Sequence, residues 1–133
     1  MLTYYEKGEL HQGKVTVILS GDRPFRQLLF DDLKLMTLDG RPSDLDKNYP
    51  TKVMPFISEQ ASKISKVISY EDVGEKEIQR IHEFAAKAKA QGKKVRLWAT
   101  PEKEELWEEL IKAEVGLINT DDLGRLRRYL MNR

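Results

Sequence analysis

Short runs of apolar and β-branched residues recur along the chain and predict its strands. Five such runs lie at 15–20, 34–38, 54–58, 95–99 and 115–120. Most are nearly continuous in apolar residues rather than strictly alternating, which is typical of strands covered on both faces of a parallel sheet. The pattern therefore predicts a buried, mostly parallel sheet.

Helical periodicity marks the segments between these strands. Apolar stripes predict helices over 74–91, 101–112 and 121–131, and weaker patterns predict helices over 24–31 and 59–68. Strands that alternate with helices favour right-handed βαβ units. Because no Ser- or Gly-rich linker divides the chain, we expect a single α/β domain over 1–133 that begins with a polar leader, 1–14.

Two details of the predicted helices can be tested against a structure. Thr100 and Pro101 suit the N-cap and the first position of the helix over 101–112. The last helix is expected to bury Leu123, Leu126 and Leu130 along one stripe.

Composition and charge exclude several classes of function. The 23 Lys and Arg residues nearly balance the 22 Asp and Glu residues, and the formal net charge is +1. This balance argues against a general nucleic-acid binder and against attraction to an anionic membrane. The chain has no cysteine, so it has no disulfide and no thiolate metal site. With no apolar run near the roughly 20 residues of a membrane span, and no apolar region at the start, we expect a soluble, cytoplasmic protein.

Polar side chains follow the carboxyl ends of the predicted strands, which is where ligands bind in parallel α/β folds. Arg23 and Arg41 could hold a phosphate through paired guanidinium donors. Asp39, Glu59 and Asp121 could bind a divalent cation such as Ca²⁺ or Mg²⁺, or transfer protons. Each residue could instead cap a helix or form a turn. The whole set expected near this end of the sheet is Asp22, Arg23, Asp39, Arg41, Glu59, Asn119 and Asp121.

Five motifs occur in order across nearly the whole chain. They are GKVTVILSGDRP (13–24), LDGRPSDL (38–45), MPFIS (54–58), QGKKVRLWATPE (91–102) and LINTDDL (117–123). As a set they resemble the C-terminal half of bacterial phosphodiesterases related to phosphatidylinositol-specific phospholipase C. Glycerophosphodiester phosphodiesterases are more distant members of the same superfamily.

The resemblance implies a fold and a site. The fold would be the second half of a (β/α)8 barrel, which typically has about 250 residues. The first half of that barrel would carry the acid–base histidines and most of the metal-binding carboxylates. By position, the residues that would line the substrate side are Ser20, Asp39, Arg41 and Trp98. Trp98 could equally pack under the helix that follows it.

The resemblance leaves three hypotheses for function. The first is a non-catalytic half-barrel that folds alone or as a pair. It would form a homodimer, pair with the missing barrel half, or stay a monomer rearranged into a flatter open α/β sheet, and a phosphate-bearing small molecule is its candidate ligand. The second is an active phosphoric diester hydrolase on glycerol- or inositol-type phosphodiesters. The third is an engineered α/β scaffold with an introduced ligand or metal site, which departures from the family pattern such as 113–116 allow. We favour the first because neither His11 nor His82 follows a predicted strand.

Overall fold

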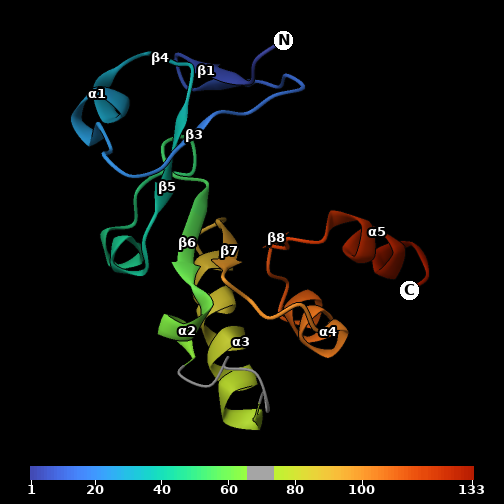
Figure 1. Ribbon diagram of the computed structural model, residues 1–133. Coiled ribbons are helices and arrows are strands. Elements are labelled where there is room, and N and C mark those ends of the chain that lie inside the picture. Colours follow the sequence, from blue (N-terminus) through green and yellow to red (C-terminus); the bar gives the residue numbers. More distant parts are fainter. Residues whose placement is uncertain (66–73) are drawn as a thin grey trace.

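A five-stranded parallel sheet forms the centre of the structure, a computed structural model that describes residues 1–65 and 74–133 (Figure 1). The strands lie in the order β3 (Ile18–Leu19), β5 (Thr37–Gly40), β6 (Phe56–Gln60), β7 (Lys94–Trp98) and β8 (Leu117–Ile118). Every pairing between them is parallel. The predicted α/β fold with a parallel sheet is thus confirmed, and it is compatible with half of a (β/α)8 barrel.

Helices connect the strands in the predicted alternation. They are α1 (Phe25–Phe30), the 3-10 helix η1 (Pro42–Lys47), α2 (Ala61–Ile64), α3 (Glu75–Lys89), α4 (Glu104–Lys112) and α5 (Leu123–Met131). The first, fourth and last of these agree closely with the predictions over 24–31, 74–91 and 121–131. Of the helix predicted over 59–68, only the first turn forms α2, and residues 66–68 lie outside the described residues.

The helix expected to start at Thr100 and Pro101 begins later. Lys103 is the residue before α4, and the Thr100 hydroxyl donates to the backbone carbonyl of Asn119 at 3.1 Å. Ala99, directly after β7, has φ +54°, a left-handed conformation that turns the chain sharply. The predicted Thr100 cap is wrong because this threonine ties the turn to the end of the neighbouring strand β8.

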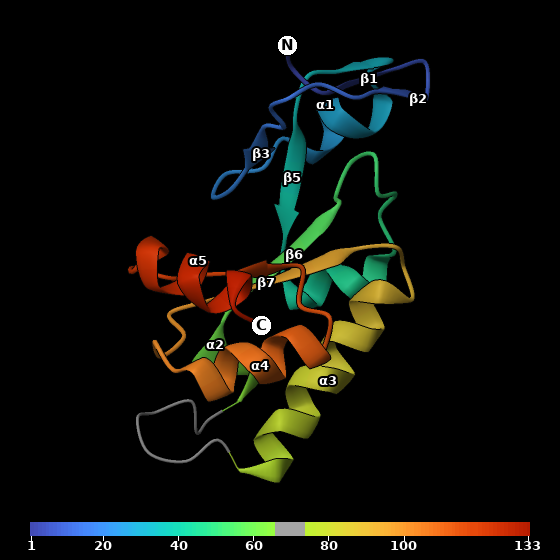
Figure 2. The ribbon, with the colours of Figure 1, turned by 90° about the vertical axis from the view of Figure 1, so that its right-hand side faces the viewer.

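A second, antiparallel sheet contains part of the segment expected to be a polar leader. Its order is β2 (Glu9–His11), β1 (Tyr4–Glu6) and β4 (Leu33–Lys34), and Figure 2 shows it at the far end of the molecule from α3. Lys7 and Gly8 form the turn of the hairpin with φ +49° and +90°, as two-residue hairpin turns require. Because β4 pairs with β1, the single strand predicted over 34–38 is divided between β4 and β5.

The two faces of the parallel sheet have different surroundings, because side chains two residues apart on a strand share a face. One face carries Leu38, Ile57 and Leu97, which are fully buried and pack in the core with apolar residues of α3 and α4. The opposite face carries polar side chains, including Asp39, Ser58, Arg96 and Asn119. No described helix is long and apolar enough to cross a membrane.

Candidate functional site

A concave surface lies on the polar face of the parallel sheet. Two hollows of about 230 and 300 Å³ share Ser20, Asp39 and Arg96 as lining residues, so we treat them as one, the strand-end hollow. Ile18 of β3 and Leu117 of β8 both line it, which shows that the sheet curves around it. The remaining lining residues are Arg41, Phe56, Ser58, Glu59, Lys63 and Trp98.

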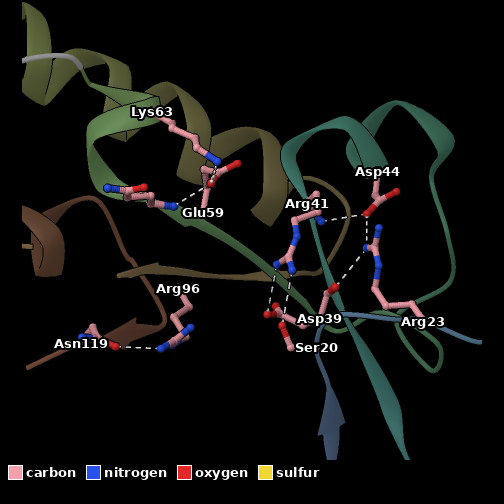
Figure 3. A network of polar contacts seen from close by, with 10 residues as sticks. Ser20, Arg23, Asp39, Arg41, Asp44, Glu59, Lys63, Arg96 and Asn119 are labelled. Atoms are coloured by element: carbon pink, nitrogen blue, oxygen red, sulfur yellow. Dashed lines mark hydrogen bonds and ion pairs between the residues drawn. The ribbon is translucent and has the colours of Figure 1, made fainter. Parts of the chain in front are cut away.

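Arg41 and Asp39 form one wall of the hollow (Figure 3). The Arg41 guanidinium donates to the Ser20 hydroxyl at 3.4 Å and to Oδ2 of Asp39 at 3.5 Å. Asp39 is only 7% exposed, and its Oδ1 has no hydrogen-bond partner among the described residues. The buried hydroxyl of Ser58, on β6, also lacks one there. Leaving buried polar atoms unpaired costs about 1–3 kcal/mol each, so this wall has hydrogen-bonding capacity that a ligand can use.

Arg23 supports this wall from outside the hollow. Its guanidinium donates to Oδ2 of Asp44 at 2.5 Å and to the backbone carbonyl of Asp39 at 3.1 Å. Asp44 also accepts the backbone N–H of Arg41 at 2.8 Å, at the start of η1. The two arginines are therefore linked through two aspartates instead of converging on one anion, and Arg23 is a positioning residue.

The charge on Asp44 is stabilised by its surroundings. Burial is the largest single effect and raises the pKa of the Asp44 carboxyl. The hydrogen bonds from Arg23 and Arg41, together with the positive charges of Arg23 and Lys47, outweigh burial and hold that pKa below its ordinary value. Asp44 is thus ionised at neutral pH and anchors both arginines.

Arg96 carries the positive charge of the hollow that no carboxylate balances. Its guanidinium donates to the amide oxygen of Asn119 at 2.8 Å, and no ion pair of the described residues includes it. By contrast, Lys63 lies 3.3 Å from the Glu59 carboxylate, and Arg41 faces Asp39. The local excess of positive charge therefore lies at Arg96.

The three residues whose carboxylates are expected to bind a cation do not converge on one point: two have cationic partners and the third lies away from the hollow. Asp39 lies against a guanidinium, as described above, and Glu59 pairs with Lys63. Asp121 does not line the hollow, and its backbone N–H donates to the Glu102 carboxylate at 2.8 Å. In the part of the chain that the structure describes, no group of three or more His, Cys, Asp or Glu side chains could hold a metal ion.

The structure brings together most of the residues singled out from the sequence and adds others. The four that the resemblance implies, Ser20, Asp39, Arg41 and Trp98, line the hollow, whereas Asp22 is exposed. The sequence pattern did not single out Asp44, Ser58, Lys63 or Arg96. Arg96 stands two residues before Trp98 on β7, so alternation places both side chains on one face. Treating 95–99 as a continuous apolar strand hid this arginine.

A curved parallel sheet with a polar hollow on its open face defines the class, an α/β domain of the kind in which ligands meet the carboxyl ends of the strands. The model of the glycerophosphoryl diester phosphodiesterase family matches residues 94–124. This segment contains β7, α4 and β8, with Arg96, Trp98 and Asn119 of the site. No curated protein matches the chain, and no solved structure matches it. The family match supports a glycerophosphodiester phosphodiesterase-like domain.

Proposed function

We propose that this chain binds a glycerol- or inositol-type phosphodiester in the strand-end hollow and does not hydrolyse it on its own. The observation that carries the proposal is the Arg96 guanidinium, which lines the hollow and is bound to a neutral amide rather than a carboxylate. A phosphodiester carries one negative charge, and a guanidinium donates to phosphate oxygens with two parallel N–H groups.

The unpaired buried atoms of the hollow favour a ligand that also carries hydroxyl groups. The free Oδ1 of Asp39 can accept a hydroxyl hydrogen, and the Ser58 hydroxyl can donate to a ligand oxygen. Trp98, which is half-buried, offers a flat apolar surface for the carbon face of a polyol. A phosphate joined to a polyol can bind Arg96 through its charge and also use Asp39, Ser58 and Trp98, whereas a plain phosphate leaves the apolar surface of Trp98 unused.

The binding role without hydrolysis rests on where the two histidines lie. His11 stacks on Tyr4 in the antiparallel sheet, with ring centroids 4.4 Å apart. The His82 Nε2 lies 4.0 Å from the Glu109 carboxylate, between α3 and α4. Neither histidine lines the strand-end hollow, so a histidine acid–base pair for phosphodiester cleavage would come from residues outside this chain.

Amide and indole NMR signals of the ¹⁵N-labelled protein test this binding. We expect glycerophosphocholine to shift the indole N–H signal of Trp98 and to leave that of the fully buried Trp107 in place. Arg96→Gln should weaken this binding about tenfold or more, since a hydrogen bond to a charged group contributes about 1.5–3 kcal/mol. Arg80→Gln, on the exposed face of α3 and paired with Glu77, is the matched control.

Two outcomes would contradict the proposal. If glycerophosphocholine shifts neither the Trp98 indole nor the amides of Ser20 and Arg41, the hollow is not a phosphodiester site. Turnover of bis(p-nitrophenyl) phosphate with Ca²⁺ or Mg²⁺ that is abolished by Asp39→Ala or Glu59→Ala would show instead an active hydrolase.

A further inference from the structure

Exposed large apolar side chains are confined to the two ends of the described sequence. Every one of them lies in residues 1–35 or 117–131, and the most exposed within α1 and α5 are Phe30 at 79%, Leu123 at 76% and Met131 at 72%. Figure 1 shows α5 beside the edge strand β8, and α1 on the other side of the parallel sheet, toward the antiparallel sheet. Apolar surface is thus left uncovered beside β8 and, near the other end of the chain, on α1 and in the antiparallel sheet, and not on the middle strands of the parallel sheet.

Helix α5 has an apolar stripe without a partner. The sequence pattern predicts that Leu123, Leu126 and Leu130 are buried together, but only Leu126 is buried, and Leu130 is 47% exposed. The prediction is wrong for the other two leucines in the single chain. An amphipathic helix that leaves much of its stripe in water is typical of a surface that binds another protein chain.

The two uncovered surfaces, one at the end of α1 and the other on α5, carry opposite charges. We name residues 29–33 (Leu-Phe-Asp-Asp-Leu) the acidic edge patch, since Asp31 and Asp32 are exposed there beside Phe30. Lys34, which follows, is buried and donates to the backbone carbonyl of Asp31. The basic edge patch consists of the exposed residues of α5, Leu123, Arg127, Arg128, Leu130 and Met131. Apolar side chains are interleaved with charges of one sign in each patch, so the two patches are complementary.

From this complementarity we propose that a second copy of this chain covers both edges in a two-fold dimer. The acidic edge patch of each copy contacts the basic edge patch of the other. A two-fold axis that runs along the strand direction places β8 of one copy beside, and parallel to, β3 of its partner. The same rotation places β3 of the first copy beside β8 of the partner. A single two-fold pairing therefore covers all the patches, with no surface left to recruit a third copy.

The dimer also changes the strand-end hollow. Ile18 and Leu117, from the two edge strands, line that hollow, and the partner's edge strands continue the sheet beyond them. Two curved sheets facing one another enclose the polar faces of both copies. The inference depends on the edges alone and stands whether or not the hollow binds a phosphodiester.

Sedimentation velocity at several protein concentrations tests the dimer. We expect the unaltered chain to sediment as a species of twice the 15.5 kDa chain mass. Two double variants reverse one patch each: Asp31→Lys with Asp32→Lys, and Arg127→Glu with Arg128→Glu. Each variant alone brings like charges together in its dimer, so its dissociation constant should rise at least about tenfold. Lys76→Glu with Lys87→Glu, on the exposed face of α3, changes the charge equally away from the edges and should leave the dimer intact.

Mixing the two reversed variants gives the decisive result. A copy with two acidic patches and a copy with two basic patches satisfy both contacts, so the mixture should recover a one-to-one dimer that neither variant forms alone. An unaltered chain that stays monomeric overturns the inference. It is also overturned if the variants dimerise as well as the unaltered chain, or if their mixture stays monomeric. Because all four altered residues are exposed, circular dichroism should show unchanged folding, and Phe30→Ser provides an uncharged test of the same edge.

Discussion

At the scale of single residues, Asp44 organises the wall of the strand-end hollow. It is 1% exposed, accepts hydrogen bonds from Arg23 and from the backbone of Arg41, and does not itself line the hollow. The sequence indicated that polar residues at the strand ends gather. The sequence did not indicate which carboxylate binds each arginine. Arg23 and Asp44 are 21 residues apart along the chain, and they come into contact only because β3 pairs with β5.

Replacing Asp44 should destabilise the fold measurably. Asp44→Asn keeps the shape of the side chain but removes its charge, and we expect a loss of about 1–3 kcal/mol at pH 7, measured by urea denaturation. The native pKa lies below the ordinary 3.8, so the stabilisation is complete above pH 3.8 and is lost as the pH falls through the lower native value. The stability difference between the two proteins should therefore shrink below pH 3.8.

A nearby carboxylate provides the control for this prediction. Asp46 pairs with Lys87 on the surface, where its side chain is 73% exposed, and such pairs contribute about 0–1 kcal/mol. Asp46→Asn should therefore leave the urea midpoint nearly unchanged. Equal losses at positions 44 and 46 would show that the buried aspartate does not anchor the arginines.

At the scale of elements, the sequence predicts best where one periodicity decides the structure. The strand at 95–99 and the helix at 74–91 are both found within two residues, because each buries a regularly spaced apolar set in one core. The hairpin of β1 and β2 is missed, although Lys7-Gly8 between two short polar strands is a hairpin signal. Its strands are half-exposed and depend on β4, a long-range pairing that a local pattern does not contain.

The end of β5 requires a glycine because the neighbouring strand approaches closely. A Cβ at Gly40 would lie 2.5 Å from both the Ile57 Cδ1 and the Met54 Sδ, and 2.8 Å from the Phe56 carbonyl oxygen. Gly40→Ala should therefore destabilise the fold by about 1–3 kcal/mol in thermal or chemical denaturation.

Gly124 offers the comparison for that substitution. It lies in α5, where an added Cβ makes contacts no closer than 3.5 Å, and alanine favours helix by up to about 1 kcal/mol. Gly124→Ala should be neutral or stabilising. A harmless Gly40→Ala would mean that β5 and β6 do not approach as closely as described.

At the scale of the whole molecule, the sequence predicts the parallel sheet and the side of it that carries polar groups. Parallel strands bring their carboxyl ends together, which is why Ser20, Asp39 and Arg41 could be expected near one another from chain order alone. The uncovered stripe of α5 could not be expected in the same way. The periodicity of Leu123 and Leu130 indicates that a surface is covered, but not whether this chain or another chain covers it.

The proposed dimer links stability to concentration. When folded copies associate and unfolded chains do not, mass action raises the unfolding midpoint as protein concentration increases. We expect the thermal midpoint of the unaltered chain to rise over a hundredfold range of concentration, measured by calorimetry. The midpoint of the chain with Arg127→Glu and Arg128→Glu should stay constant. A constant midpoint for both proteins would contradict the dimer.

The opposite edges of the parallel sheet also have a consequence for handling this protein. The contact of β8 with a second copy's β3 is head-to-tail, and in the proposed dimer the two-fold arrangement closes it. If the first encounter has a different twist, each added copy presents a fresh β3 or β8 to the next, and a filament grows. Refolding at high salt weakens the attraction between the charged patches and so slows formation of the dimer, while the edge strands β3 and β8 stay exposed. Such conditions should therefore favour fibrous precipitate over soluble protein.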